Sequence, residues 1–120
     1  MANPNLFATS ALYGKTAGMA VTTSTTAIVT NSASSGKVYK VNSLIIANVD
    51  GTNSATCEVD VSTDNQSSNY ALVYNLVVPP GATIAILTTP LYLDETDSIR
   101  VSANNNSDLQ WFASGTELID

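Results

Sequence analysis

The sequence predicts an all-β protein built as a single antiparallel β-sandwich, jelly-roll-like in form. Hydrophobic residues make up 44% of the 120 residues and charged residues only 12%, which is too little charge for the solvated surface of a helical protein. Short runs rich in Val, Ile, Thr and Tyr recur between clusters of Gly, Asn, Asp, Ser and Pro, a pattern typical of sandwiches and barrels. A chain of this length has room for one hydrophobic core.

Residues 1–12 are expected to form an extended N-terminal arm ahead of a sandwich domain of residues 13–120. Pro4 and the scattered apolar side chains of Leu6 and Phe7 follow neither a strand period nor a helix period. Arms of this kind commonly pack on a neighbouring subunit, so the arm is a candidate contact surface.

The first strands are expected at residues 16–22 and 25–30, both rich in threonine. The strongest strand is expected at residues 37–49, which carries apolar side chains on both faces and therefore belongs in the centre of a sheet. Simple alternation places Val41, Ile45, Ala47 and Val49 on one face, and Lys40, Asn42, Leu44, Ile46 and Asn48 on the other.

After a turn at Asp50-Gly51, residues 56–62 alternate and predict a strand with Cys57, Val59 and Val61 pointing inward. The next strand carries an apolar row of Tyr70, Leu72, Tyr74, Leu76 and Val78. Pro79-Pro80-Gly81 should end it, because proline cannot donate to a ladder and glycine tolerates positive φ.

Further strands are expected at residues 83–87, 91–93, 99–103 and 109–114, which brings the total to eight or nine. Trp111 in the last of them is expected to be a large core or interface residue.

Charge and cysteine content limit the possible partners. The formal net charge is −6 and only four residues are basic, so no basic stripe is present to bind nucleic acid.

Cys57 is the only cysteine, which excludes an internal disulfide and fits a reducing compartment. No apolar run approaches the ~20 residues of a membrane span, and the N-terminus lacks the pattern of a signal peptide. We therefore expect a soluble protein that is not exported.

Histidine is absent from the sequence, and this argues strongly against an enzyme. Ser-His-Asp and Cys-His constellations cannot form, and a dyad of serine with Lys15, Lys37 or Lys40 would be a chance pairing. Gly14-Lys15-Thr16 ends like a phosphate-binding loop, but Thr9 stands where that loop requires glycine. We expect no catalytic residues and no cofactor.

An acidic segment at residues 94–97 could offer carboxylates to calcium, together with Asp50, Asp60 or Asp64 if their loops meet. Its spacing does not match a helix-loop-helix calcium site. An ordinary solvated turn is the expected structure, and we assign no metal ligands.

Aromatic residues could instead supply a sugar-stacking platform. Most of them fall inside predicted strands, where core packing is expected; they are Tyr13, Tyr39, Tyr70, Tyr74, Tyr92, Trp111 and Phe112. Trp111 and Phe112 must point to opposite faces, so a partner or the arm should cover one of them. The expected interface residues are Leu6, Phe7, Leu12, Trp111, Phe112 and Leu118.

Several stretches resemble small virion structural proteins of tailed bacteriophages, the decoration or head-tail proteins. These stretches are Gly14-Lys15-Thr16, Ser35-Gly36-Lys37-Val38, residues 43–51, Val78-Pro79-Pro80-Gly81 and residues 91–101. The resemblance spans most of the chain and contains no chemical motif. It implies a β-sandwich or jelly-roll-like protein of the phage particle with no enzymatic residues.

The resemblance does not fix the position on the particle. A small, soluble, acidic domain without histidine and with a free N-terminal arm suits a capsid decoration protein, so we expect binding to the major capsid protein on the outer shell of the virion after synthesis in the host cytoplasm. A neck, tail or baseplate component, bound to other virion proteins, is the alternative, and a carbohydrate- or receptor-binding module is a second alternative. Repeated positions on a particle and the need to cover edge strands predict a homo-oligomer, with a trimer as the first expectation.

Overall fold

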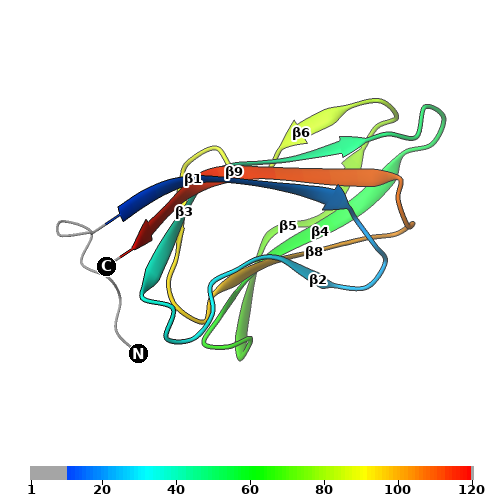
Figure 1. The fold of residues 1–120 in the computed structure, drawn as a ribbon. Coiled ribbons are helices and arrows are strands. Elements are labelled where there is room, and N and C mark those ends of the chain that lie inside the picture. Colours follow the sequence, from blue (N-terminus) through cyan, green and yellow to red (C-terminus); the bar gives the residue numbers. More distant parts are fainter. Residues whose placement is uncertain (1–10, 120) are drawn as a thin grey trace.

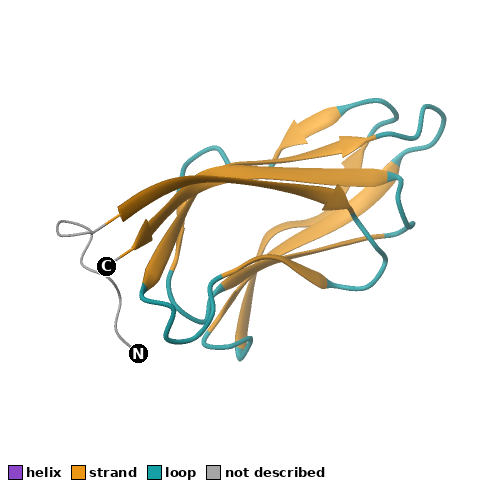
Figure 2. Ribbon diagram, viewed as in Figure 1, coloured by secondary structure: helices purple, strands orange, loops and turns teal. Residues whose placement is uncertain are grey.

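The computed structural model describes residues 11–119, in which all regular structure is β-strand (Figures 1 and 2). The strands are β1 (Ala11–Ala20), β2 (Thr26–Thr30), β3 (Lys37–Asn48), β4 (Ala55–Thr63), β5 (Ser68–Val78), β6 (Thr83–Ala85), β7 (Leu91–Leu93), β8 (Ser98–Ala103) and β9 (Leu109–Ile119). None of the described segments is a helix long and apolar enough to cross a membrane.

The strands form two antiparallel sheets that face each other, which confirms the predicted β-sandwich (Figure 1). The five-stranded sheet has the order β1-β9-β3-β6, and β7 also pairs with β3. The four-stranded sheet has the order β2-β8-β4-β5. β3 is central as expected, because it pairs with β9 on one side and with β6 and β7 on the other. The jelly-roll form remains a prediction.

The hydrophobic core lies between the sheets and draws on both. Leu44, Ile46 and Trp111 from the five-stranded sheet and Ile99 and Val59 from the four-stranded sheet are each at most 6% exposed. Burial of such side chains from two facing sheets is the main stabilisation of a sandwich. Cys57 is part of this core, which confirms its predicted inward direction.

A β-bulge in β3 changes which side chains face the core. Val41 lies opposite Gly115 and Ser43 opposite Ser114, so Asn42 is an extra residue without a partner in β9. The bulge reverses the alternation, so that Val41 shares the inner face with Leu44. The expected grouping of Val41 with Ile45 is therefore wrong, because it assumed an unbroken strand.

The bulge requires a glycine in β9. A Cβ added to Gly115 would lie 2.1 Å from the carbonyl oxygen of Lys40 and 2.9 Å from Cα of Val41. Both are backbone atoms, so no side-chain rotation could relieve the overlap. The two strands can approach this closely only because residue 115 has no side chain.

Two buried asparagines connect the sheets at opposite ends of β3. Asn31, directly after β2, donates from Nδ2 to the carbonyl oxygens of Lys37 (2.8 Å) and Leu93 (3.0 Å). Asn48, at the end of β3, donates from Nδ2 to the carbonyl oxygen of Val78 in β5 (2.9 Å). Each side chain is at most 3% exposed, and a buried amide that satisfies loop and strand carbonyls fixes the ends of the sandwich.

Other strand predictions are confirmed with shifted boundaries. β1 begins at Ala11, earlier than expected, so Ala11 and Leu12 belong to a strand, while residues 1–10 of the predicted arm lie outside the described range. β9 continues to Ile119. Gly81 has φ of +71°, and β5 ends at Val78, as the Pro-Pro-Gly segment predicts.

We predict that Gly115→Ala lowers the free energy of unfolding by about 3 kcal/mol, the upper end of overpacking costs, because backbone must move. Gly14→Ala in β1 is the matched control, since a Cβ there meets nothing within 4 Å. Urea unfolding followed by tryptophan fluorescence measures both variants. Equal stability of the two would contradict the close approach of β9 to β3.

Candidate interaction surface

The outer face of the five-stranded sheet is the candidate site, and we define it as the face turned away from the four-stranded sheet. Trp111, Leu44 and Ile46 point to the core, so their neighbours along each strand point outward. Directly paired residues share a face, which gives the outer face as Leu12, Gly14, Thr16, Gly18, Ala20, Val38, Lys40, Ser43, Ile45, Ala47, Thr83, Ala85, Tyr92, Gln110, Phe112, Ser114, Thr116 and Leu118.

This face is almost without charge. Lys40 is its only ionisable side chain apart from the tyrosine, and its Nζ lies 6.0 Å from the ring centroid of Tyr92. The described acidic residues all lie elsewhere, in the other sheet, in loops or on the inner face. The solvent face of an antiparallel sheet normally carries polar and charged residues, so an uncharged face in a protein of net charge −6 is unusual.

Phe112 lies on the outer face in β9, between Gly18 of β1 and Ile45 of β3, and is 47% exposed. Its ring lies over Gly18, where an added Cβ would approach Phe112 Cδ1 to 2.7 Å. A hollow of about 520 Å³ lies beside the ring, and its outer-face lining is Gly18, Ala20, Ile45, Ala47 and Gln110. A projecting aromatic ring next to an apolar hollow is the usual form of an anchor point in a protein interface.

The structure places the predicted interface residues in three different settings. Leu12 (62% exposed) pairs with Leu118, and both share the outer face with Phe112. Trp111 is 6% exposed and belongs to the core. Trp111 and Phe112 thus point to opposite faces, as expected. Leu6 and Phe7 lie outside the described residues.

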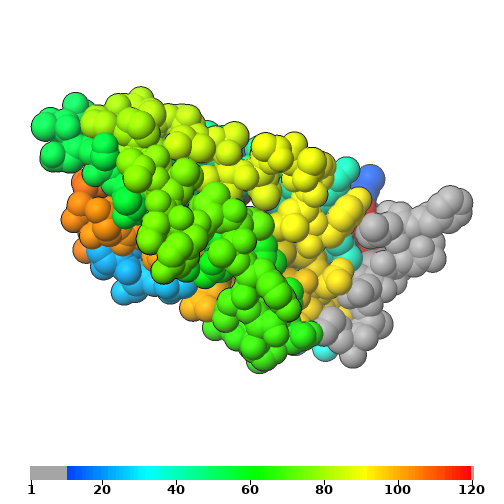
Figure 3. All heavy atoms as spheres, turned by 180° about the vertical axis from the view of Figure 1, so that it is seen from behind, coloured from blue at the N-terminus to red at the C-terminus, as the bar shows by residue number. Residues whose placement is uncertain are grey.

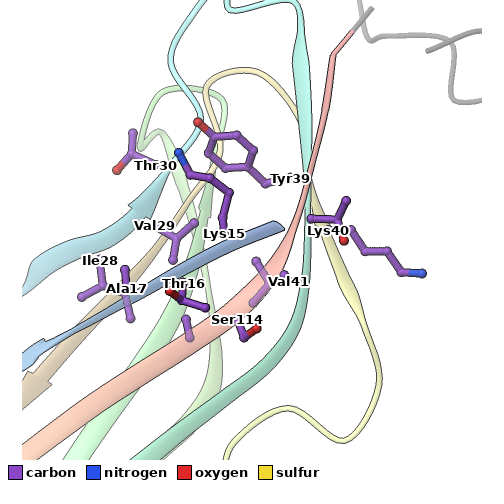
Figure 4. Close-up of a pocket in the computed structure, with 13 residues that line it drawn as sticks. Lys15, Thr16, Ala17, Ile28, Val29, Thr30, Tyr39, Lys40, Val41 and Ser114 are labelled. Carbon is purple, nitrogen blue, oxygen red and sulfur yellow. The ribbon is translucent and has the colours of Figure 1, made fainter. Parts of the chain in front are cut away.

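A second feature is a cavity of about 220 Å³ between the sheets, where β1 and β2 form the open side of the sandwich (Figure 4). Ala17, Val29 and Val41 give it apolar walls. Lys15 and Tyr39 point into the gap toward β2, whereas Lys40 points away from it (Figure 4).

Glu117 lies on the inner face near this cavity and is 5% exposed. Lys15 Nζ lies 3.1 Å from its carboxylate, and Lys37 forms a second ion pair with the other oxygen. The hydrogen bond from Lys37 and the charge of Lys15 hold the pKa of Glu117 below its usual value of 4.5. Lys15 and Lys37, two of the three lysines considered for a dyad with serine, are therefore paired with the carboxylate of Glu117.

The acidic segment forms a hydrogen-bonded turn, in which the backbone N–H of Asp94 donates to the carboxylate of Asp97. Burial, and then the nearby carboxylates of Asp94 and Asp64, raise the pKa of Asp97. The loop after β4 meets this turn through a hydrogen bond from Asn65 N–H to Thr96. Within residues 11–119, no group of three or more His, Cys, Asp or Glu side chains is placed to hold a metal ion.

Burial also sets the state of the single thiol. It raises the pKa of Cys57 to about 11, so the thiol is protonated at neutral pH. A protonated, buried thiol is a poor nucleophile, and Cys57 contributes packing only.

The prediction that most aromatic residues pack in the core is wrong. Five of the seven are exposed: Tyr13, Tyr70, Tyr74, Tyr92 and Phe112. Tyr70 (63% exposed) and Tyr74 (69% exposed) lie on β5, which covers much of the face seen from behind (green, Figure 3). β5 is an edge strand with two register shifts, so its apolar row does not face the core uniformly. The alternation of apolar residues in the sequence could not reveal these register shifts, because they depend on the pairing with β4.

No protein-family model and no curated protein matches this chain. Solved structures similar to it include two of a pentameric capsid protein isolated from metagenomic phage sequences, one of them solved by iodide SAD phasing. Each is 18% identical to this chain with a TM-score of 0.38 and covers 87% of it. This chain spans 60% and 64% of theirs. A likeness at this level does not establish a shared function.

We predict that the contribution of Glu117 to stability depends on pH. A carboxyl group whose pKa is lowered in the folded state stabilises the fold above its unfolded pKa, and this stabilisation is lost as the pH falls through the folded value. The stability advantage of the wild type over Glu117→Gln should be largest near neutral pH and shrink below about pH 4.5.

Urea unfolding at a series of pH values measures this difference. Glu58→Gln in β4 controls for the loss of one negative charge. An advantage that stays constant from neutral to acidic pH would show that the ion pairs with Lys15 and Lys37 do not stabilise the fold.

Proposed function

We propose that this chain is a non-enzymatic structural protein of a tailed-phage virion, and that it decorates the capsid by binding the major capsid protein on the outer shell. The observation that carries this proposal is the outer face, which has Lys40 as its single charged side chain and the exposed ring of Phe112 between β1 and β3. The resemblance of residues 43–51 and 91–101 to phage virion proteins supports the particle as its location.

The outer face has the properties of a protein-binding surface. Its exposed side chains include Leu12 (62%), Tyr92 (47%) and Phe112 (47%). The core is complete without them, because Leu44, Ile46 and Trp111 fill the space between the sheets. Aromatic residues with few charges around them characterise the centre of an interface, so this face is suited to a partner protein.

A capsid decoration protein and a neck, tail or baseplate component would use the same face. The two placements differ in copy number, since a shell offers one site for every one or few capsid subunits and a ring offers a fixed small number. The small size, net negative charge and absence of histidine suit the shell, and the homo-oligomer expected for a repeated particle position fits either placement.

The outer face can be tested with Phe112→Ser. Truncating a central aromatic anchor typically costs about 2 kcal/mol of binding free energy, which is about thirtyfold in Kd. We therefore expect the variant to rebind particles that lack this protein at least about thirtyfold more weakly than the wild type, measured by co-sedimentation. The fold should survive, because the ring is half-exposed.

Tyr70→Ser is the matched control, since it also removes an exposed aromatic ring but from β5. It should rebind like the wild type. Normal rebinding of Phe112→Ser, or a loss with Tyr70→Ser alone, would show that the outer face does not dock on the shell.

A carbohydrate- or receptor-binding module is the second candidate, and one observation favours it. Tyr70 and Tyr74 are both exposed on β5, beside the exposed amides Asn69 and Asn75. The buried position of Trp111 removes the strongest stacking ring from such a site. Binding to a glycan array that the double variant Tyr70→Ser/Tyr74→Ser abolishes would support this function over decoration.

A further inference from the structure

β1 is an open edge strand, a feature that the proposed function does not use. It stands at the end of the five-stranded sheet, and among the strands of residues 11–119 it pairs only with β9. All ten of its residues pair in unbroken register from Ala11 to Ala20, and eight of them are exposed. It contains no proline and no bulge. A long, regular and exposed edge is a template for pairing with another strand.

The other edges of the sandwich are protected, in the part of the chain that the structure describes. β2 has five residues and a register shift. β5 has two register shifts and a positive φ of 52° at Asn75. β6 and β7 have three residues each, and the segment between them contains Pro90. Short strands, bulges, proline and charged side chains are the usual means of preventing edge pairing. β1 has none of the first three, and the charge of its one lysine, Lys15, is paired with Glu117 of its own sheet.

The ladder with β9 determines which groups of β1 are free. The N–H of Val21, which follows β1 in the same register, donates to the carbonyl oxygen of Leu109. Hydrogen-bonded pairs alternate along an antiparallel ladder, so odd-numbered residues of β1 bond to β9. The N–H and C=O groups of the even-numbered residues point away from it; these residues are Leu12, Gly14, Thr16, Gly18 and Ala20.

We propose that β1 pairs antiparallel with β1 of a second copy, which joins the two five-stranded sheets across a two-fold axis at Thr16. We name a second copy as the partner because, among the described strands, β1 is the only open edge with which β1 of another copy could pair. The two-fold axis follows, since the same strand lies on both sides of the contact.

The free backbone groups restrict the register. An even-numbered residue must stand opposite an even-numbered residue, because only these residues can exchange hydrogen bonds across the new edge. The two longest registers of this kind are centred on Lys15 and on Thr16. The first places Lys15 opposite Lys15 of the second copy, and like charges directly opposite destabilise a sheet.

The register centred on Thr16 avoids this repulsion and uses all five free residues. Lys15 then faces Ala17 of the second copy, and Tyr13 faces Met19 of the second copy. Tyr13 and Met19 are 56% and 68% exposed, and sulfur and aromatic side chains attract each other. A two-fold contact of this kind gives a dimer, so it does not close the trimer expected from the sequence.

Charge variants at the two-fold axis test this pairing. Thr16→Lys and Thr16→Glu each place two like charges directly opposite each other, at a Cα separation of about 5.5 Å for a hydrogen-bonded pair. Each variant alone should dissociate at least about tenfold more readily than the wild type. An equimolar mixture should restore the dimer as a heterodimer, because opposite charges then meet.

Analytical ultracentrifugation of the full chain over about 1 µM to 1 mM gives the dissociation constants, and native mass spectrometry identifies the heterodimer. Thr52→Lys, the same change in an exposed loop, should dimerise like the wild type.

Several results would overturn the proposal. They are a wild type that stays monomeric at all concentrations, an oligomer unaffected by Thr16→Lys, and a mixture that does not recover. A monomer that takes up a strand from a different protein would show that β1 serves another partner. The dimerisation experiment contains no capsid, so its failure would not affect the particle-binding test of Phe112→Ser.

Discussion

The close approach of Gly115 to the backbone of Lys40 and Val41 is the contact on which the arrangement of side chains in the five-stranded sheet depends. It allows the bulge at Asn42, and the bulge reverses the alternation of β3. Before the bulge, Tyr39 and Val41 face inward and Lys40 faces outward. Without it, Lys40 would point into the core. One missing side chain in β9 therefore decides both the composition of the core and the character of the outer face.

Much of the fold could be predicted from the sequence, because turn residues and strand-forming runs are local signals. The positions of β3, β4 and β8, the stop after Val78 and the opposite directions of Trp111 and Phe112 are of this kind. Bulges are not local, since a bulge depends on the partner strand. The faces of β3 were therefore misassigned at Val41, and the apolar row of β5 was expected to pack inward although Tyr70 and Tyr74 are exposed.

The candidate surface was predictable in part. The sequence singled out Leu12, Phe112 and Leu118, which share the outer face. It did not show which apolar residues lie next to them on this face or that no acidic residue does, because that depends on how β1, β3 and β9 align. The charged groups next to the core are instead concentrated where Glu117 holds Lys15 and Lys37. This separation leaves a face with few charges for a partner protein and, at the end of the same sheet, an open edge at β1 for a second copy.

Quantitative mass spectrometry of purified virions tests the central claim, a structural role on the phage particle, most directly. The account predicts that the chain is present at one copy for every one or few copies of the major capsid protein. A ratio that corresponds to a single ring would place it in the neck or tail instead. Its absence from the particle would contradict the account.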